Sequence, residues 1–90
     1  MTEEEFENAS LEAMAKHLLL LGSIMQSAEN PVIESVGLGS AFAEILAMVY
    51  MDYEDPSVRR LLLKEMTEAV HKKALETLEK FETEQAGTVH

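Results

Sequence analysis

Apolar residues recur along most of the chain with the spacing of about 3.6 residues that is typical of helices. Three segments carry such a pattern, over residues 3–26, 31–51 and 56–85. The first and third segments each combine one apolar side with one polar side, whereas the middle segment is apolar nearly all round. The pattern therefore predicts an all-α protein with three helices.

Residues at the segment ends support these boundaries. Thr2 and Glu5 have the spacing of a capping box, in which the Thr hydroxyl accepts a hydrogen bond from a backbone amide of the first helical turn. Asn30 and Asp55 are good N-caps, and each precedes a proline, which favours the first helical position. Both connections are short, so we expect a three-helix antiparallel (up-down-up) bundle, forming a single domain over residues 1–86.

The C-terminal helix is the longest of the three. At 1.5 Å per residue it would reach roughly 40 Å, against about 30 Å for the middle helix, so its end would overhang the bundle. Gly87 offers a helix stop, and residues 87–90 are expected to form a flexible tail. Charges alternate in sign at every fourth position on its predicted solvent side, at Lys64, Glu68, Lys72, Glu76, Lys80 and Glu84.

The middle helix is unusual because Glu34 and Glu44 are its only charged residues between Val32 and Met51. A helix that is apolar all round is buried on most sides or spans a membrane. Its length suits a span of about 20 residues. A charged residue at the bilayer centre costs on the order of 2.5 kcal/mol or more, and flanking basic and aromatic anchors are missing. We therefore expect a soluble helix rather than a membrane span.

Small residues follow one another along this helix, which favours close packing against another helix over a ligand-binding groove. Two neighbouring helices cover only part of its circumference, and an uncovered apolar patch usually marks an interface. We therefore expect a homodimer to complete the bundle. The candidate interface residues are Gly37, Gly39, Ala43, Ala47, Met48, Met51, Leu61 and Leu75.

Length and composition exclude several classes of protein. Ninety residues form one small domain, so a two-lobed enzyme is excluded. The chain has no cysteine, which excludes disulfides and thiolate-bound metals. Its formal net charge of −10 disfavours direct binding to nucleic acid or anionic membranes. The acidic N-terminus does not resemble an export signal, so we expect a cytoplasmic protein.

Two positions carry candidate chemistry. His17 lies within the apolar stripe of the first helix and is expected to be buried, with Glu44 or Ser40 as its hydrogen-bond partner. Glu68 and His71 have the Glu-x-x-His spacing of di-iron helical bundles, but Glu68 belongs to the charged side. They remain weak metal candidates that a homodimer would duplicate. No catalytic set stands out, so we expect neither enzyme activity nor a cofactor.

These features favour a non-catalytic, acidic helical protein that acts by binding another protein, as an adaptor, chaperone or inhibitor. One alternative is an acidic mimic of nucleic acid that blocks a basic protein cleft. Another is a dimeric metal-binding protein that uses Glu68 and His71.

Overall fold

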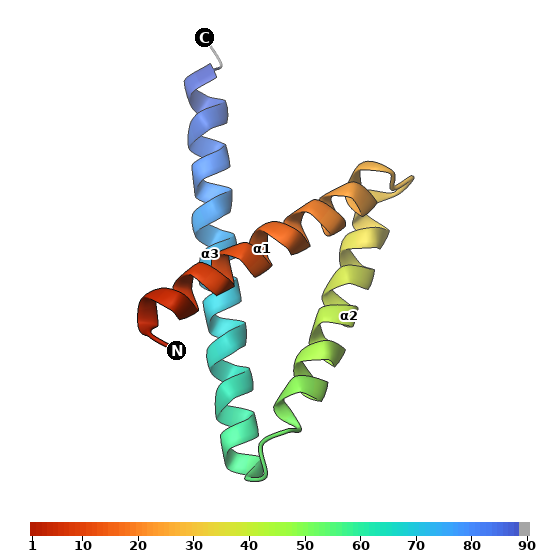
Figure 1. The fold of residues 1–90 in the computed structure, drawn as a ribbon. Coiled ribbons are helices and arrows are strands. Elements are labelled where there is room, and N and C mark those ends of the chain that lie inside the picture. Colours follow the sequence, from red (N-terminus) through yellow and green to blue (C-terminus); the bar gives the residue numbers. More distant parts are fainter. Residues whose placement is uncertain (89–90) are drawn as a thin grey trace. The chain divides into compact units, whose positions relative to one another are not determined.

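The structure is a computed structural model that describes residues 1–88 and the side chains of residues 1–87. Over these residues it is all-helical, with three helices and no strand (Figure 1). Helix α1 spans Glu3–Gln26, α2 spans Pro31–Tyr50 and α3 spans Pro56–Thr88. The prediction of an all-α protein with three helices is therefore confirmed.

The chain divides into two compact units, Met1–Phe42 and Ala43–His90, and the boundary between them lies inside α2. The first unit holds α1, the connection over residues 27–30 and the first part of α2. The second holds the rest of α2, the connection over residues 51–55 and α3. The single domain over residues 1–86 stays a prediction.

Each helix begins where a side chain satisfies its first backbone amides, which would otherwise lack partners. The Thr2 hydroxyl accepts a hydrogen bond from the Glu5 amide at 3.1 Å. Asn30 Oδ1 accepts from the amides of Val32 and Ile33 at 3.1 and 3.3 Å. Asp55 Oδ1 accepts from the Ser57 amide at 2.8 Å. The three predicted caps are thus confirmed.

The far ends of α2 and α3 differ from expectation. Helix α2 ends at Tyr50, although the Met51 amide still donates to the Ala47 carbonyl at 3.2 Å. Helix α3 continues through Gly87 to Thr88, so the helix stop predicted at Gly87 is wrong. The reason is conformational, because no glycine has the positive φ that a left-handed cap requires. The rest of the predicted tail, residues 89–90, lies outside the described residues.

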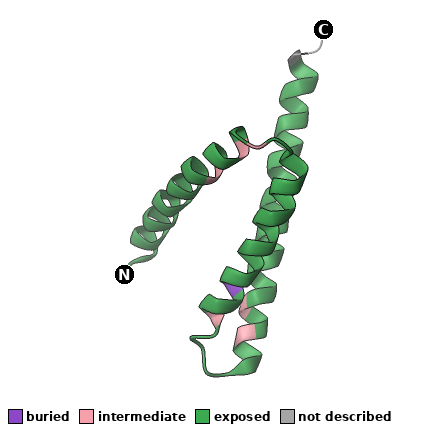
Figure 2. Ribbon diagram, turned by 90° about the vertical axis from the view of Figure 1, so that its right-hand side faces the viewer, coloured by how far each residue is buried: buried purple, intermediate pink, exposed green. Residues whose placement is uncertain are grey.

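Very little of the chain is buried by its own fold (Figure 2). Among residues 1–87 only Leu46, in the second unit, is buried, at 9% exposure. The apolar stripes predicted to form a core in α1 and α3 are instead largely exposed. Their exposed members include Phe6, Met14, Leu18, Ile24, Met66, Val70, Leu78 and Phe81.

Candidate interaction surface

Helix α2 exposes large apolar side chains along its whole length. Met48 is 72% exposed and Val32 is 71% exposed. Exposed apolar side chains are common singly on protein surfaces, but a large number of them on one helix favours a binding site. At about 100° per residue they lie all round α2 rather than on one side. We call the following more than half-exposed residues the α2 surface: Val32, Ile33, Val36, Ile45, Met48 and Val49.

The structure leaves the predicted interface residues accessible. A Cβ atom built on Gly37 or Gly39 would meet no atom within 4 Å outside its own helical surroundings. The close helix packing expected at these two glycines is therefore not formed within the first unit, and its formation elsewhere stays a prediction. The other candidates, Ala43, Ala47, Met48, Met51, Leu61 and Leu75, are also exposed.

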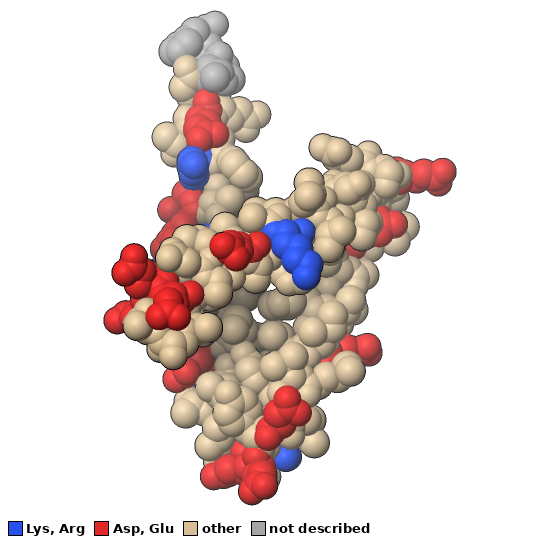
Figure 3. All heavy atoms as spheres, in the orientation of Figure 1, with Lys and Arg blue, Asp and Glu red and all other residues tan. Residues whose placement is uncertain are grey.

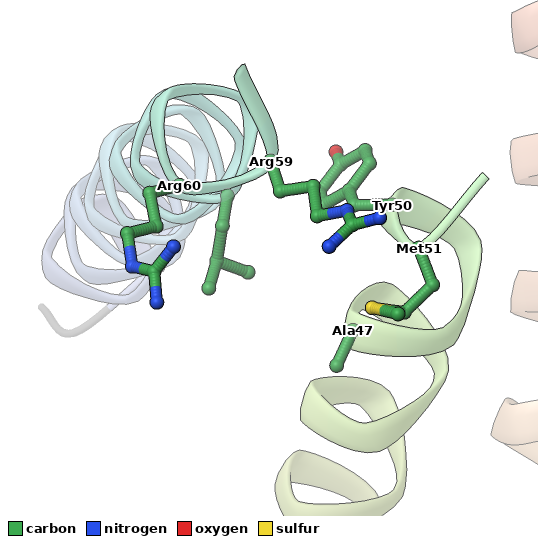
Figure 4. Close-up of a pocket in the computed structure, with 6 residues that line it drawn as sticks. Ala47, Tyr50, Met51, Arg59 and Arg60 are labelled. Atoms are coloured by element: carbon green, nitrogen blue, oxygen red, sulfur yellow. The ribbon is translucent and has the colours of Figure 1, made fainter. Parts of the chain in front are cut away.

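In the second unit, a hollow of about 310 Å³ lies between the end of α2 and the start of α3. We call it the arginine groove, and it is lined by Ala47, Tyr50, Met51, Arg59, Arg60 and Leu63. Figure 4 shows Ala47 on α2 and Met51 directly after it, with the Arg59 side chain reaching from α3 to the side of Tyr50. The groove therefore combines apolar lining with two positive charges.

Both arginines are tied to the backbone by a single nitrogen. Arg59 Nε donates to the Tyr53 carbonyl. Arg60 Nη1 donates to the Pro56 carbonyl at 3.2 Å. Each guanidinium carries five N–H donors, so each retains several for another acceptor.

The first unit contains two further hollows where α1 and α2 are connected. One, of about 250 Å³, is lined by Leu21, Ile24, Met25, Glu34, Gly37, Leu38 and Ala41. The other, of about 390 Å³, surrounds the connection and is lined by Ile24, Ser27, Ala28, Glu29, Asn30, Ile33 and Glu34. Glu34 borders both, so neither hollow is purely apolar.

His17 is exposed in the structure. Ser40 and Glu44, its expected hydrogen-bond partners, are exposed as well. Burial of the His17 imidazole stays a prediction.

Glu68 and His71 are both exposed on α3. Within the described residues, no group of three or more His, Cys, Asp or Glu side chains is placed to hold a metal ion. One copy therefore does not assemble the metal site considered from the Glu-x-x-His spacing. Completion of that site by a second copy stays a prediction.

Negative charge gathers at the start of α1, where Glu3, Glu4 and Glu5 form the first turn (Figure 3). In contrast, α2 carries only Glu34 and Glu44 along its twenty residues. Acidic side chains at a helix N-terminus are favourable because they face the positive end of the helix dipole. Helix stability thus accounts for at least part of this acidity.

Helix α2 is also long and apolar enough to cross a membrane, by length and composition alone. Within α2 only Leu46 is buried. The core helix of a soluble protein passes the same length test, but such a helix would be mostly buried. Most of α2 is thus exposed in the structure.

Sequence reasoning did not identify Tyr50, Arg59, Arg60 and Leu63 as part of a site. The available signal was the Arg59–Arg60 pair, which contains the only arginines of an acidic chain. It also missed the exposure of Leu19 and Leu20 on α1. Four consecutive leucines at 18–21 cannot all lie on one side of a helix, because successive residues are about 100° apart.

No protein-family model, curated protein or solved structure matches this chain.

Proposed function

We propose that this protein is a non-catalytic interaction protein that works as a homodimer in the cytoplasm and binds another protein as an adaptor, chaperone or inhibitor. The observation that carries the proposal is the exposure of the α2 surface, together with Leu46 as the only buried residue among residues 1–87. Because apolar area removed from water is the main stabilising term in association, such a surface favours a partner.

In the proposed dimer, the helices of each copy follow an antiparallel, up-down-up order, and the second copy completes the bundle. The interface would include Gly37, Gly39, Ala43, Ala47 and Met48 of α2, Met51 directly after it, and Leu61 and Leu75 of α3. Small residues on α2 allow two backbones to approach closely, which compensates for the poor helix propensity of glycine.

The alternative is that α2 spans a membrane, so that lipid surrounds its exposed apolar side chains. Glu44 opposes this alternative, because it lies in the interior of α2 and a charged side chain at the bilayer centre costs about 2.5–3.5 kcal/mol. No basic residue lies in the last turn of α2 to anchor it at a lipid surface. A protein interface has a polar, hydrated rim, which a bilayer centre lacks, so we favour a second copy.

Size-exclusion chromatography with light scattering tests the dimer directly. At micromolar concentration we expect a mass of about 20 kDa, twice that of the 10.0 kDa chain. A monodisperse 10.0 kDa species at this concentration would contradict the proposal.

A further inference from the structure

The arginine groove has the features of a site for a carboxylate-bearing apolar segment. Its lining includes the apolar side chains of Ala47, Met51 and Leu63. Within the described residues neither Arg59 nor Arg60 has a carboxylate partner within 4.0 Å. Guanidinium groups bind carboxylates in a bidentate manner, and more strongly where water is partly excluded.

Neighbouring acids in the sequence do not fill this role. Asp52, Glu54 and Asp55 lie in the connection just before the arginines. Asp55 is engaged instead as the N-cap of α3, through its hydrogen bond from Ser57. The two guanidinium groups therefore remain available to a carboxylate from another segment.

The start of α1 offers the complementary chemistry. Glu3, Phe6 and Glu7 are separated by three and four residues, so they lie on one face of the helix. Phe6 is 63% exposed, and both carboxylates are exposed as well. We call these three residues the acidic face of α1. It presents an aromatic ring beside two negative charges.

We propose that the arginine groove of one copy binds the acidic face of α1 of a second copy. Phe6 would lie on the apolar lining, and Glu3 and Glu7 would pair with Arg59 and Arg60. Two-fold symmetry forms this contact twice in each dimer, because each copy supplies one groove and one acidic face. The inference rests on the homodimer of the proposed function and assigns part of its interface.

Two observations favour a second copy over an unrelated protein as the occupant. One is charge complementarity, because the only two arginines of the chain line the groove, whereas the chain as a whole has a net charge of −10. Continuity is the other, because Ala47 and Met51 belong both to the groove and to the proposed dimer interface. An acidic segment of a different protein is an alternative that the following experiment distinguishes.

Exchange of charge between the two surfaces tests the proposal. One variant carries Arg59→Glu and Arg60→Glu, and another carries Glu3→Lys and Glu7→Lys. Each alone should raise the dimer dissociation constant about tenfold or more, because like charges then meet at both contacts. An equimolar mixture should form a heterodimer with close to wild-type affinity, since every contact in it is again between opposite charges.

Two control variants make the same change in net charge elsewhere. Glu4→Lys with Glu5→Lys alters the same helical turn but a different face of α1. Lys72→Glu with Lys73→Glu alters an adjacent basic pair on α3. Both should dimerise within about threefold of wild type, because they lie outside the proposed contact.

Analytical ultracentrifugation gives the dissociation constants, and native mass spectrometry identifies the heterodimer. A wild-type monomer would overturn the proposed function and this inference together. A wild-type dimer with unchanged affinity in the charge-exchanged variants would overturn the inference alone. Failure of the mixture to form heterodimer, or equal weakening by the control variants, would also overturn it, and an unrelated acidic partner would then be the better occupant.

Discussion

Gly37 and Gly39 lie inside α2, and the structure of a single chain does not explain why glycine stands at these two helical positions. Glycine inside a helix is less favourable than alanine by about 1 kcal/mol, because it loses more backbone entropy on folding. Neither glycine has a neighbouring atom within 4 Å of its would-be Cβ. The cost is therefore not offset by close packing within the first unit, and it would be offset by a second helix.

Substitution of Gly39 distinguishes a glycine that stays open in the single chain from one that packs against a helix of a second copy. Gly39→Leu raises helix propensity and meets open space in the single chain, yet it would prevent close approach at the proposed interface. We expect unchanged or increased helix content by circular dichroism and a dimer dissociation constant raised about tenfold or more.

Gly22→Leu is the matched control, because Gly22 is equally open but lies in α1, outside the proposed interface. This variant should gain helix content and dimerise like wild type. Equal weakening by both substitutions, or wild-type affinity of Gly39→Leu, would remove the glycines from the interface.

At the scale of elements, α2 has the length and composition of a membrane span but carries two carboxylates. We expect the wild-type protein to remain in the aqueous fraction when it is floated with zwitterionic lipid vesicles. Glu34→Leu with Glu44→Leu should increase association with vesicles, because it removes a cost of about 2.5–3.5 kcal/mol for each charge at the bilayer centre.

Glu34→Gln with Glu44→Gln is the intermediate control, since it removes the charges but keeps polar side chains. Flotation of the wild-type protein with α2 protected from protease would show that a bilayer, not a second copy, covers this helix.

The helix starts could be predicted from the sequence because capping is decided within a few residues. Thr2, Asn30 and Asp55 each bind amides two or three positions further along the chain. The end of α3 could not be predicted in the same way, because Gly87 permits a left-handed cap without requiring one.

The candidate site was less predictable, because burial depends on what covers a residue. The α1 stripe suggested a buried His17, but amphipathic spacing shows only which side of a helix is apolar and not what packs against it. Helix α2 has no polar side to define its orientation. The arginine groove also escaped prediction, since it combines residues from two helices and the turn between them.

For the whole molecule, stability and association should be one process. Helices of this length are marginal alone in water, and packing normally supplies most of their stability. With Leu46 as the only residue among 1–87 that the single chain buries, little apolar burial opposes the conformational entropy of the unfolded state. The folded monomer is therefore expected to be sparsely populated.

The dependence of the unfolding temperature on protein concentration tests whether folding and association are one process. A hundredfold increase in protein concentration should raise the unfolding temperature, followed by circular dichroism, by roughly 5–10 °C, because mass action favours the folded dimer. An unfolding temperature that does not depend on concentration would indicate a monomer that is stable alone, or a dimer whose chains remain associated when they unfold. Light scattering at the same concentrations distinguishes these two cases.

The near absence of a buried core has a consequence for the protein inside a cell. Proteases degrade chains that are unfolded, and here the unfolded fraction would depend on how many copies are present to pair. Newly made chains would be short-lived while scarce and would persist once synthesis exceeds the rate of their removal. Because of the exposed α2 surface, gene dosage and expression rate would set the lifetime of the protein as well as its amount.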